Sequence, residues 1–333
     1  MQAVVMTATG APDRLALREV PIPAIEQPNQ VLIRVRAAGV NPIDTKLRRN
    51  GTFYPDRLPA ILGCDGAGIV EAVGNDVSRF SPGDEVYYCY GGIGAGCGNY
   101  AEYTLVDECA LSLKPAALDF EQAAAAPLVL ITAWEALYDR ARMESGHTIL
   151  IHAGAGGVGH VAIQIAHETG ARIATTVGNR EKAGLVTELG ADLPILYRET
   201  DFVEAVMQWT NNRGVDIAMD NVGGPLLQTT FPAVRFYGDV VSLLLPDKET
   251  DWSIARQRNL RTSLEVMLTP MLLGLKKATI HQAKILEACA NLFDAGKLRI
   301  HISETLPLSS AARAHELIET GSTTGKIVLR ISN

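Results

Sequence analysis

Four glycines, at positions 154, 156, 157 and 159, stand between a short apolar run and a helical pattern. The apolar run is Ile149–Ala153, and the helical pattern begins at Val158. Glycine allows a tight turn here and lets backbone N–H groups approach a pyrophosphate, while the start of the next helix adds partial positive charge. The G-x-G-x-x-G spacing in this context therefore predicts a dinucleotide site and hydride chemistry. The predicted cradle consists of Gly154, Gly156, Gly157, Val158 and Gly159.

The segments after this loop argue against an ordinary glycine-rich turn without a ligand. Residues 171–177 are typical of a second strand, and residues 180–189 of a second helix that ends at Gly190, which completes a βαβα unit. An NAD site usually has Asp or Glu at the end of this second strand, to accept from the ribose 2′-OH. Here Gly178 and Asn179 stand at that end, followed by Arg180 and Lys182, whose charge suits a 2′-phosphate. The sequence therefore favours NADPH, with solvated helix charges as the alternative interpretation of the two cations.

The amino-acid composition is that of a globular protein and excludes several other classes of protein. The chain has 333 residues, of which 47% are hydrophobic and 20% charged, and both fractions are ordinary for globular proteins. The net charge of −7 and the lack of a basic block argue against a nucleic-acid partner. We find no run of 18 apolar residues and no signal-peptide pattern, so we expect no membrane partner. Five scattered cysteines suit a reducing compartment, and we expect a cytoplasmic protein.

The sequence pattern changes near Asp119, from strands and turns to alternating helices and strands. Before it, turn pairs separate short segments with β-branched or alternating patterns, which predicts a mostly antiparallel, barrel-like β domain. The strand candidates there are 4–6, 15–20, 31–36, 66–73, 84–90 and 100–106. Asp119 and Gln122 then resemble a capping box that opens an alanine-rich helix.

After that helix, strands and helices alternate, which implies a parallel sheet covered on both faces. Six strands in two mononucleotide halves give the expected order 3-2-1-4-5-6. The strand candidates are 148–153, 172–177, 193–197, 215–221, 238–245 and 261–267. The helix candidates between them are 158–169, 180–189, 201–211 and 225–234.

The last 60 residues do not fit that alternation. We expect helices at 279–295 and at 309–320, the second with Ser309 as N-cap, and a final strand at 325–331. We expect this tail to return to the first domain. The predicted domains are therefore 1–124 with 270–333, and 125–269. The active site is expected in the cleft between them, at the carboxyl ends of the parallel strands.

A series of short motifs now supports a resemblance to a known family. The motifs, in order, are Ala38–Asp44 (A-G-V-N-P-I-D), Gly63–Gly68 (G-C-D-G-A-G), Phe80–Val86, Tyr100–Tyr103, Thr132–Ala133, Ala153–Gly159, Asp220–Gly224 and Gly325–Leu329. The chain resembles the zinc-independent quinone oxidoreductases, the ζ-crystallin-like branch of the medium-chain dehydrogenase/reductase superfamily, almost from end to end. The resemblance implies an α/β protein with a GroES-like β-barrel catalytic domain and a Rossmann domain with a doubly wound, six-stranded parallel sheet.

The resemblance also bears on metal binding. Zinc alcohol dehydrogenases of this superfamily use Cys, His and Cys, the ligands that tetrahedral zinc prefers. Here Asn41 stands at the first ligand position and Cys64 at the second, while Cys89 and Cys97 lack C-x-x-C spacing. We therefore expect no metal. Without a Lewis acid on an alcohol oxygen, hydride donation to an already polarised acceptor remains feasible.

By the same resemblance, Asn41 and Thr132 lie near the nicotinamide, and Asp44 is a partner residue in the same loop as Asn41. Asp44 also fits a helix-start acid after Pro42. Tyr54 is the candidate hydroxyl donor to the substrate, unless it only lines the pocket. Lys46 stands where relatives often carry Tyr, so it either alters the pocket or points to solvent.

Several further positions are implied to contact the cofactor. Tyr197 resembles the family tyrosine that reaches the 2′-phosphate, and Lys326, in G-K-x-V-L, has a surface lysine as its alternative interpretation. His152 is interpreted as a packed histidine. The remaining implied contacts follow the fourth and fifth strands of the second domain, and they are Asn221, Val222, Leu243, Leu244 and Leu245.

The sequence therefore predicts an NADPH-dependent, zinc-independent oxidoreductase that passes hydride to a quinone or activated carbonyl compound. The alternatives are an enoyl or 2-alkenal double-bond reductase and a non-catalytic NADPH-binding sensor or structural protein. The natural acceptor, one- or two-electron reduction and the proton donor stay open. By analogy with the family we expect a homodimer, paired through the sixth strand at 260–267.

Overall fold

The structure is a computed structural model that describes residues 1–94 and 96–331. The chain forms two compact units, Met1–Leu128 with Leu268–Asn333, and Val129–Met267. The predicted boundaries assigned residues 125–128 and 268–269 to the second domain, whereas the structure assigns them to the first unit. A hydrogen bond accounts for the placement of residues 125–128 in the first unit, because the backbone N–H of Leu128 donates to the Asp65 carboxylate over 2.8 Å.

Two sheets build the first unit. The small sheet has the order β2-β1-β4, and the large sheet has the order β15-β16-β3-β5-β6-β8, with β7 paired to β3. All pairs are antiparallel except β15 with β16, which confirms the mostly antiparallel β prediction. The strands are β1 Gln2–Met6, β2 Leu15–Glu19, β3 Gln30–Val40, β4 Ala60–Ile61, β5 Asp65–Val73, β6 Glu85–Cys89, β7 Tyr103–Asp107, β8 Ser112–Leu113, β15 Ile302–Pro307 and β16 Lys326–Arg330.

Alternation along β3 sets the core of this unit. Val31, Ile33 and Val35 are buried while the residues between them are half-buried, as a strand with one core face requires. Val31 and Ile33 pack with Val70, Phe80 and others in one apolar cluster.

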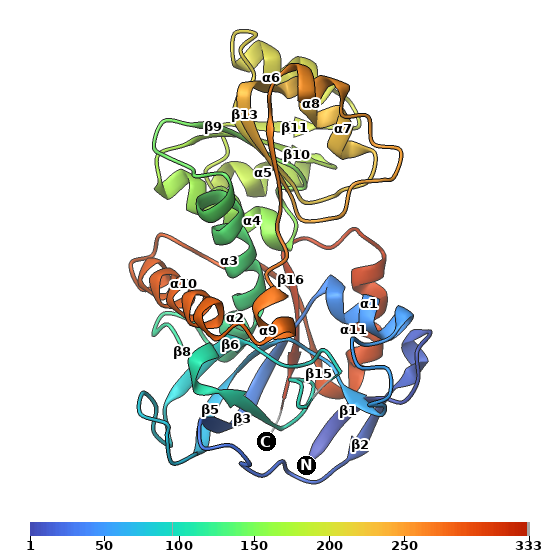
Figure 1. Ribbon diagram of the computed structural model, residues 1–333, viewed down its shortest axis with the longest axis vertical. Helices are drawn as coiled ribbons and strands as arrows, with labels where there is room; N and C mark the ends of the chain where they lie inside the picture. The colour runs from blue at the N-terminus through green and yellow to red at the C-terminus, as the bar shows by residue number, and fades with distance from the viewer. Residues whose placement is uncertain (95, 332–333) are drawn as a thin grey trace. The chain divides into compact units, whose positions relative to one another are not determined.

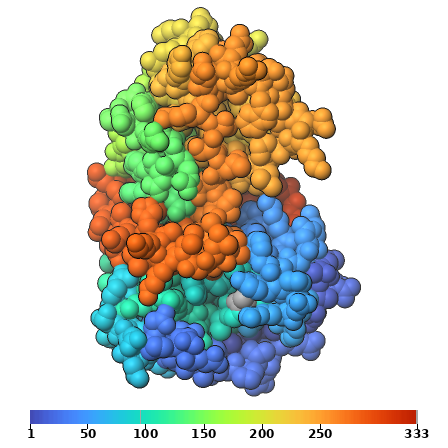
Figure 2. Space-filling model, in the orientation of Figure 1, coloured from blue at the N-terminus to red at the C-terminus, as the bar shows by residue number. Residues whose placement is uncertain are grey.

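The tail returns to the first unit, as predicted. Strand β16 pairs antiparallel with β3, with Ile327 opposite Val40, and Figure 1 shows the red strand beside the blue one. Helix α10 packs on the same unit, because the buried Tyr87 hydroxyl donates to the Leu286 carbonyl over 2.6 Å. Figure 2 shows the orange helical segment next to the cyan and teal segments of this unit. The N-cap of α11 is Ser310 and not Ser309, because residues 308–310 form a 3₁₀ turn. The helices are α1 Pro42–Asn50, α2 Phe120–Ala125, α9 Thr269–Leu273, α10 Lys276–Asp294 and α11 Ala311–Glu319, and α3 Pro127–Trp134 leads into the second unit.

A six-stranded parallel sheet forms the second unit. Its order, β11-β10-β9-β12-β13-β14, is the predicted 3-2-1-4-5-6 order. The strands are β9 Thr148–Ile151, β10 Arg172–Val177, β11 Leu193–Leu196, β12 Val215–Asp220, β13 Val234–Ser242 and β14 Arg261–Leu264. The predicted edge position of the sixth strand is confirmed, and pairing of two copies through it stays a prediction.

Helices connect these strands. They are α4 Gly157–Glu168, α5 Arg180–Glu188, α6 Phe202–Trp209, α7 Leu226–Thr230 and α8 Ser253–Gln257, and residues 135–140 form a π-helix. The predicted strand 238–245 is wrong at both ends. Pairing begins at Val234 and shifts register near Tyr237, which has φ 58°, and it stops at Ser242, after which the Leu243 N–H bonds the Asp220 carbonyl.

The core of the second unit lies on the sheet and under its helices. Leu150, Ala218 and Val240 from three neighbouring strands share one cluster with Leu227 and Phe231, all fully buried. Within the described residues, no helix is both long enough and apolar enough to cross a membrane.

Candidate functional site

The glycine loop follows β9 at the carboxyl edge of the parallel sheet. A Cβ on Gly159 would overlap the Ala153 carbonyl oxygen and lie 2.7 Å from the Gly154 Cα, and a Cβ on Gly154 would overlap the Thr175 hydroxyl. Only glycine fits these two positions without movement of the backbone or strand. Gly156 is the N-cap of α4, and Gly156, Gly157 and Val158 remain partly accessible at the start of the helix. The loop therefore presents N–H groups and a helix N-terminus to an anion.

The end of β10 carries the residues that were predicted to select the cofactor. The Asn179 side chain accepts from the Lys182 backbone N–H over 2.9 Å, so it caps α5. Arg180, the first residue of that helix, is exposed. Tyr197 follows β11 and is 51% exposed, and its hydroxyl would lie 3.4 Å from a Cβ on Gly178. Tyr197 and Arg180 therefore reach the same sheet edge from neighbouring strands.

Arg198 is a cation that the sequence reasoning did not single out. Its guanidinium lies 5.7 Å from the centre of the Tyr197 ring. The signal was present in the sequence, because Arg198 directly follows a residue already assigned to the phosphate.

Asn221 follows β12 on the same edge. Its amide nitrogen donates to the His152 carbonyl over 2.8 Å, and its Oδ1 is buried without a partner among the described residues. The His152 ring is fully buried between the hydroxyls of Thr176 and Thr230, and burial lowers its pKa to about 4. The packed-histidine interpretation of His152 is confirmed, and the ring is neutral at pH 7.

The other predicted cofactor contacts differ in exposure. Val222 is 47% exposed and Leu245 is 79% exposed. Leu243 and Leu244 are half-buried, and the Leu244 N–H bonds the Ser242 hydroxyl. Thr132 lies in α3 and is 6% exposed. Direct contact between these residues and a cofactor stays a prediction.

In the first unit, Asn41 is the centre of a buried polar network. Its amide nitrogen donates to Asp65 Oδ2 over 2.9 Å, and its Oδ1 accepts from the Lys326 ammonium. The ammonium also lies 3.5 Å from Asp65 Oδ2 and donates to the Val40 carbonyl over 3.3 Å. Lys326 is only 3% exposed, so the surface-lysine interpretation is wrong.

Asp44 lies beside Asn41 at the third position of α1. Its Oδ2 accepts from the Asn41 backbone N–H over 2.9 Å and from the Tyr100 hydroxyl over 3.0 Å, while Oδ1 is buried without a partner among the described residues. The helix-start interpretation of Asp44 is therefore confirmed, and a catalytic role stays a prediction. Burial raises the pKa of Asp44 to about 7, although both hydrogen bonds lower it.

A second row of side chains supports Tyr100. The Arg48 Nε–H donates to His315 Nδ1 over 3.3 Å, so the neutral imidazole carries its proton on Nε2, which lies 3.3 Å from the Tyr100 hydroxyl. Burial, together with the nearby Arg48 charge, lowers the pKa of His315 to about 3. The Arg48 guanidinium also pairs with Glu319. Each hydrogen bond in this row thus has a fixed direction, from Arg48 toward Asp44.

The residues nearest the predicted substrate are less enclosed. Tyr54 is half-buried in the loop after α1, and the Arg57 guanidinium lies 5.5 Å from the centre of its ring. Phe53 is 49% exposed. Lys46 is exposed on α1, which fits the interpretation that it points to solvent.

The residues around Cys64 show whether this part of the first unit could hold zinc. Burial, followed by Asp44 and Asp65, raises the pKa of the Cys64 thiol well above its ordinary value, which disfavours the thiolate that zinc requires. The Lys326 ammonium already supplies a buried positive charge there. Among residues 1–94 and 96–331, no group of three or more His, Cys, Asp and Glu is placed to hold a metal ion. The side chains of this network do not fit zinc.

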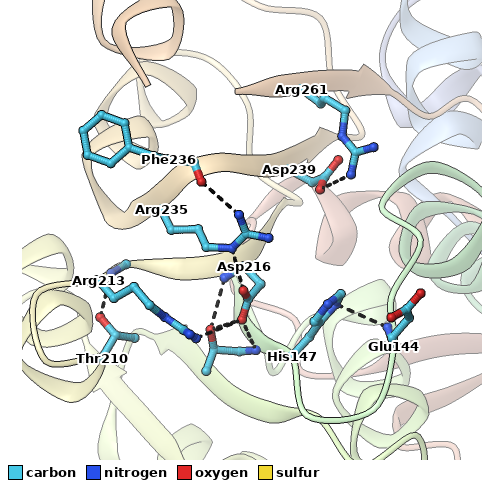
Figure 3. Close-up of polar contacts among 11 residues, drawn as sticks. Glu144, His147, Thr210, Arg213, Asp216, Arg235, Phe236, Asp239 and Arg261 are labelled. Atoms are coloured by element: carbon cyan, nitrogen blue, oxygen red, sulfur yellow. Dashed lines mark hydrogen bonds and ion pairs between the residues drawn. The ribbon is translucent and has the colours of Figure 1, made fainter. Parts of the chain in front are cut away.

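The opposite, amino edge of the parallel sheet carries a different cluster (Figure 3). Asp216 Oδ2 accepts from the backbone N–H and the hydroxyl of Thr148 over 2.8 and 2.6 Å, and Arg213 lies 3.3 Å away. Asp216 Oδ1 accepts from Arg235 over 2.6 Å. Burial raises the pKa of Asp216, but the Thr148 and Arg235 hydrogen bonds outweigh it and lower the pKa to about 2.

Comparison with known proteins covers nearly the whole chain. Residues 27–116 match the alcohol dehydrogenase GroES-like domain family, and residues 189–329 match the zinc-binding dehydrogenase family. A quinone oxidoreductase of Pseudomonas aeruginosa is 35% identical over 326 residues, which cover 97% of each chain. Among solved structures, an alcohol dehydrogenase superfamily protein of Novosphingobium aromaticivorans has a TM-score of 0.91, 35% identity and full coverage of both chains. Escherichia coli quinone oxidoreductase complexed with NADPH has a TM-score of 0.87 and 29% identity, covering 99% of this chain and 100% of that one. The predicted fold class, a GroES-like domain with a Rossmann sheet, is confirmed.

Proposed function

The chain belongs to the zinc-independent quinone oxidoreductase branch of the medium-chain dehydrogenases and reductases, and we propose that it transfers hydride from NADPH to a quinone or an activated carbonyl compound. The observation that carries the proposal is the loop after β9, where Gly154 and Gly159 leave room for close approach of a pyrophosphate. When bound, NADPH supplies the hydride from C4 of its nicotinamide.

The residues of the second unit fit such a cofactor. Asn221 Oδ1 is a buried acceptor to which none of the described residues donates, and hydroxyl or amide N–H groups of a nucleotide are donors of the required kind. Arg180 and Tyr197 stand where a 2′-phosphate would require charge and a hydroxyl, and Asn179, which caps α5, replaces the acid expected for NADH. These features favour NADPH over NADH.

The first unit supplies neutral and cationic polar groups for the acceptor. Because its network does not fit zinc, stabilisation of the oxygen that gains charge falls to hydrogen-bond donors such as the Asn41 amide and the Tyr54 hydroxyl. A conjugated acceptor, which spreads that charge, suits donors of this strength.

The test is oxidation of NADPH and NADH, followed by nicotinamide absorbance, with 1,4-benzoquinone, 9,10-phenanthrenequinone, crotonaldehyde or an enoyl thioester as acceptor. We expect quinone turnover with NADPH that a chelator does not change. Turnover confined to the enal or thioester would instead assign alkene reduction. NADPH binding without any turnover would sink the proposal and favour a sensor.

Substitution of Arg180 tests the cofactor assignment. In Arg180→Gln we expect NADPH affinity to fall about tenfold, the effect of one lost charge-assisted hydrogen bond, with NADH affinity unchanged. Arg172→Gln is the matched control, because Arg172 is exposed at the amino end of β10 and stacks on Trp209. An equal loss for both cofactors in Arg180→Gln would contradict the 2′-phosphate role.

A further inference from the structure

We propose that Lys326 and Asp65 are positioning residues that fix the Asn41 side chain as a hydrogen-bond donor to a carbonyl oxygen of the bound reactants. This inference rests on the proposed function and deepens it. It also changes the role predicted for Lys326, from a contact of the cofactor to a support of Asn41.

The orientation of the Asn41 amide is set by its two neighbours. A lysine ammonium only donates and an ionised carboxylate only accepts, so the amide oxygen must face Lys326 and the amide nitrogen must face Asp65. A flipped amide would place N–H groups against the ammonium and the carbonyl against the carboxylate. Two charge-assisted hydrogen bonds would then be lost together.

This arrangement leaves one N–H group of the Asn41 amide available for a further hydrogen bond. The amide nitrogen has two N–H groups and gives one to Asp65, while the oxygen is engaged by the ammonium. No described residue accepts from the second N–H, and the Asn41 side chain is fully buried. A buried donor without an acceptor is costly, so an incoming oxygen is the partner that satisfies it.

The charges around Asn41 limit the kind of ligand oxygen that can accept from this N–H group. The Asp65 carboxylate, 2.9 Å from the same nitrogen, disfavours an anionic ligand, and the fixed donor disfavours an amine or ammonium. A neutral carbonyl oxygen remains, and two sources provide one. They are the carbonyl of the quinone or enone and the carboxamide carbonyl of the nicotinamide.

The main variant is the double substitution Asp65→Asn with Lys326→Met. It removes both charges, so it leaves no unpaired buried ion, and an Asn at 65 both donates and accepts, so it no longer dictates the Asn41 orientation. Lys114→Met is the matched control, because Lys114 is also a buried lysine of the first unit and bonds the Leu118 carbonyl over 2.5 Å. Asn41→Leu, which keeps the Lys326–Asp65 pair, serves if the double variant does not fold.

Three readouts separate the outcomes: thermal unfolding, the NADPH dissociation constant measured by nicotinamide fluorescence, and kcat and KM for 1,4-benzoquinone. We expect the folded double variant to lose at least tenfold in one ligand readout, with Lys114→Met unchanged. A loss in kcat/KM for the quinone alone assigns the acceptor carbonyl, and a loss in NADPH affinity assigns the carboxamide.

Adding Asn41→Leu to the double variant should cause little further loss, because the three residues act as one unit. Additive losses would overturn the proposal, as would a folded double variant with both ligand readouts intact. A wild-type protein that binds NADPH but turns over no acceptor fails the proposed function alone, since the NADPH arm still tests Asn41.

Discussion

Asp44 in the first unit and Asp216 in the second are both buried aspartates that accept several hydrogen bonds, yet their acidities differ widely. Asp216 receives Thr148 and two arginines, Arg213 and Arg235, at the amino edge of the parallel sheet (Figure 3). Asp44 Oδ2 accepts from a backbone N–H and from the Tyr100 hydroxyl, and both donors are neutral. The pKa of Asp216 falls to about 2, whereas that of Asp44 rises to about 7.

The difference follows from the depth of burial and from the number of groups that favour the ion, because Asp44 is 0% exposed with two hydrogen-bond donors, whereas Asp216 is 7% exposed and has Thr148, Arg235 and Arg213 around it. The Thr148 hydroxyl and N–H, followed by Arg235 and Arg213, outweigh the desolvation of Asp216, so its ion contributes to stability. The hydrogen bonds that Asp44 accepts do not offset its desolvation, so ionisation of Asp44, beside Asn41, costs free energy in the folded protein. Asp216 therefore stays ionised at neutral pH, whereas Asp44, beside the candidate site of the first unit, has its pKa near 7.

The largest effect is expected from replacement of Arg48, which is linked to Asp44 through His315 and then Tyr100. Arg48 is 1% exposed, and Arg48→Met removes the donor to His315 Nδ1 and to the Gly10 carbonyl, while Glu319 keeps its second arginine, Arg49. We expect the free energy of unfolding to fall by about 3 kcal/mol, because two acceptors lose a charged donor and each lost bond of this kind costs about 1–3 kcal/mol. Urea unfolding measures this, and a loss below about 1 kcal/mol would show that solvent replaces Arg48.

Asp216→Asn tests the opposite region. Because the folded pKa of Asp216 lies below the ordinary 3.8, its stabilisation is present above pH 4 and is lost as pH falls toward 2. We expect the variant to be about 2 kcal/mol less stable at pH 7 and nearly equal to the wild type at pH 2. Chemical unfolding at both pH values measures the difference, and a pH-independent loss would contradict an ionic origin.

Asp44→Asn should have the smallest effect and the opposite sign. Because the folded pKa of Asp44 lies above 3.8, wild-type stability is full below pH 4, falls as pH rises to about 7, and is level above it. The amide removes that fall but leaves an unpaired N–H, so we expect a net gain of about 1 kcal/mol at pH 8. Melting curves from pH 4 to 8 test this, and an unchanged slope would show that Asp44 ionises normally.

The sequence predicted those features that depend on neighbouring residues. The glycine loop, the strand order and the tail strand all follow from local spacing and periodicity, and each is confirmed. The network around Asn41 was not predicted, because its members are 24 to 285 residues apart and meet only through strand register. Asp65 carried a signal nonetheless, since an acid in the Gly63–Gly68 turn at the start of an apolar strand requires a buried partner.

The place of Lys326 on β16 has a consequence for biosynthesis. Asn41 leaves the ribosome 285 residues before the lysine that orients it. At ~5–20 residues per second, the interval is roughly 15–60 seconds. The second unit, which is continuous in the chain, is fully translated within that interval. The nascent first unit already contains β5 and β7, which pair with β3, but still lacks β16. We therefore expect the second unit to be able to fold on the ribosome before the network around Asn41 is complete.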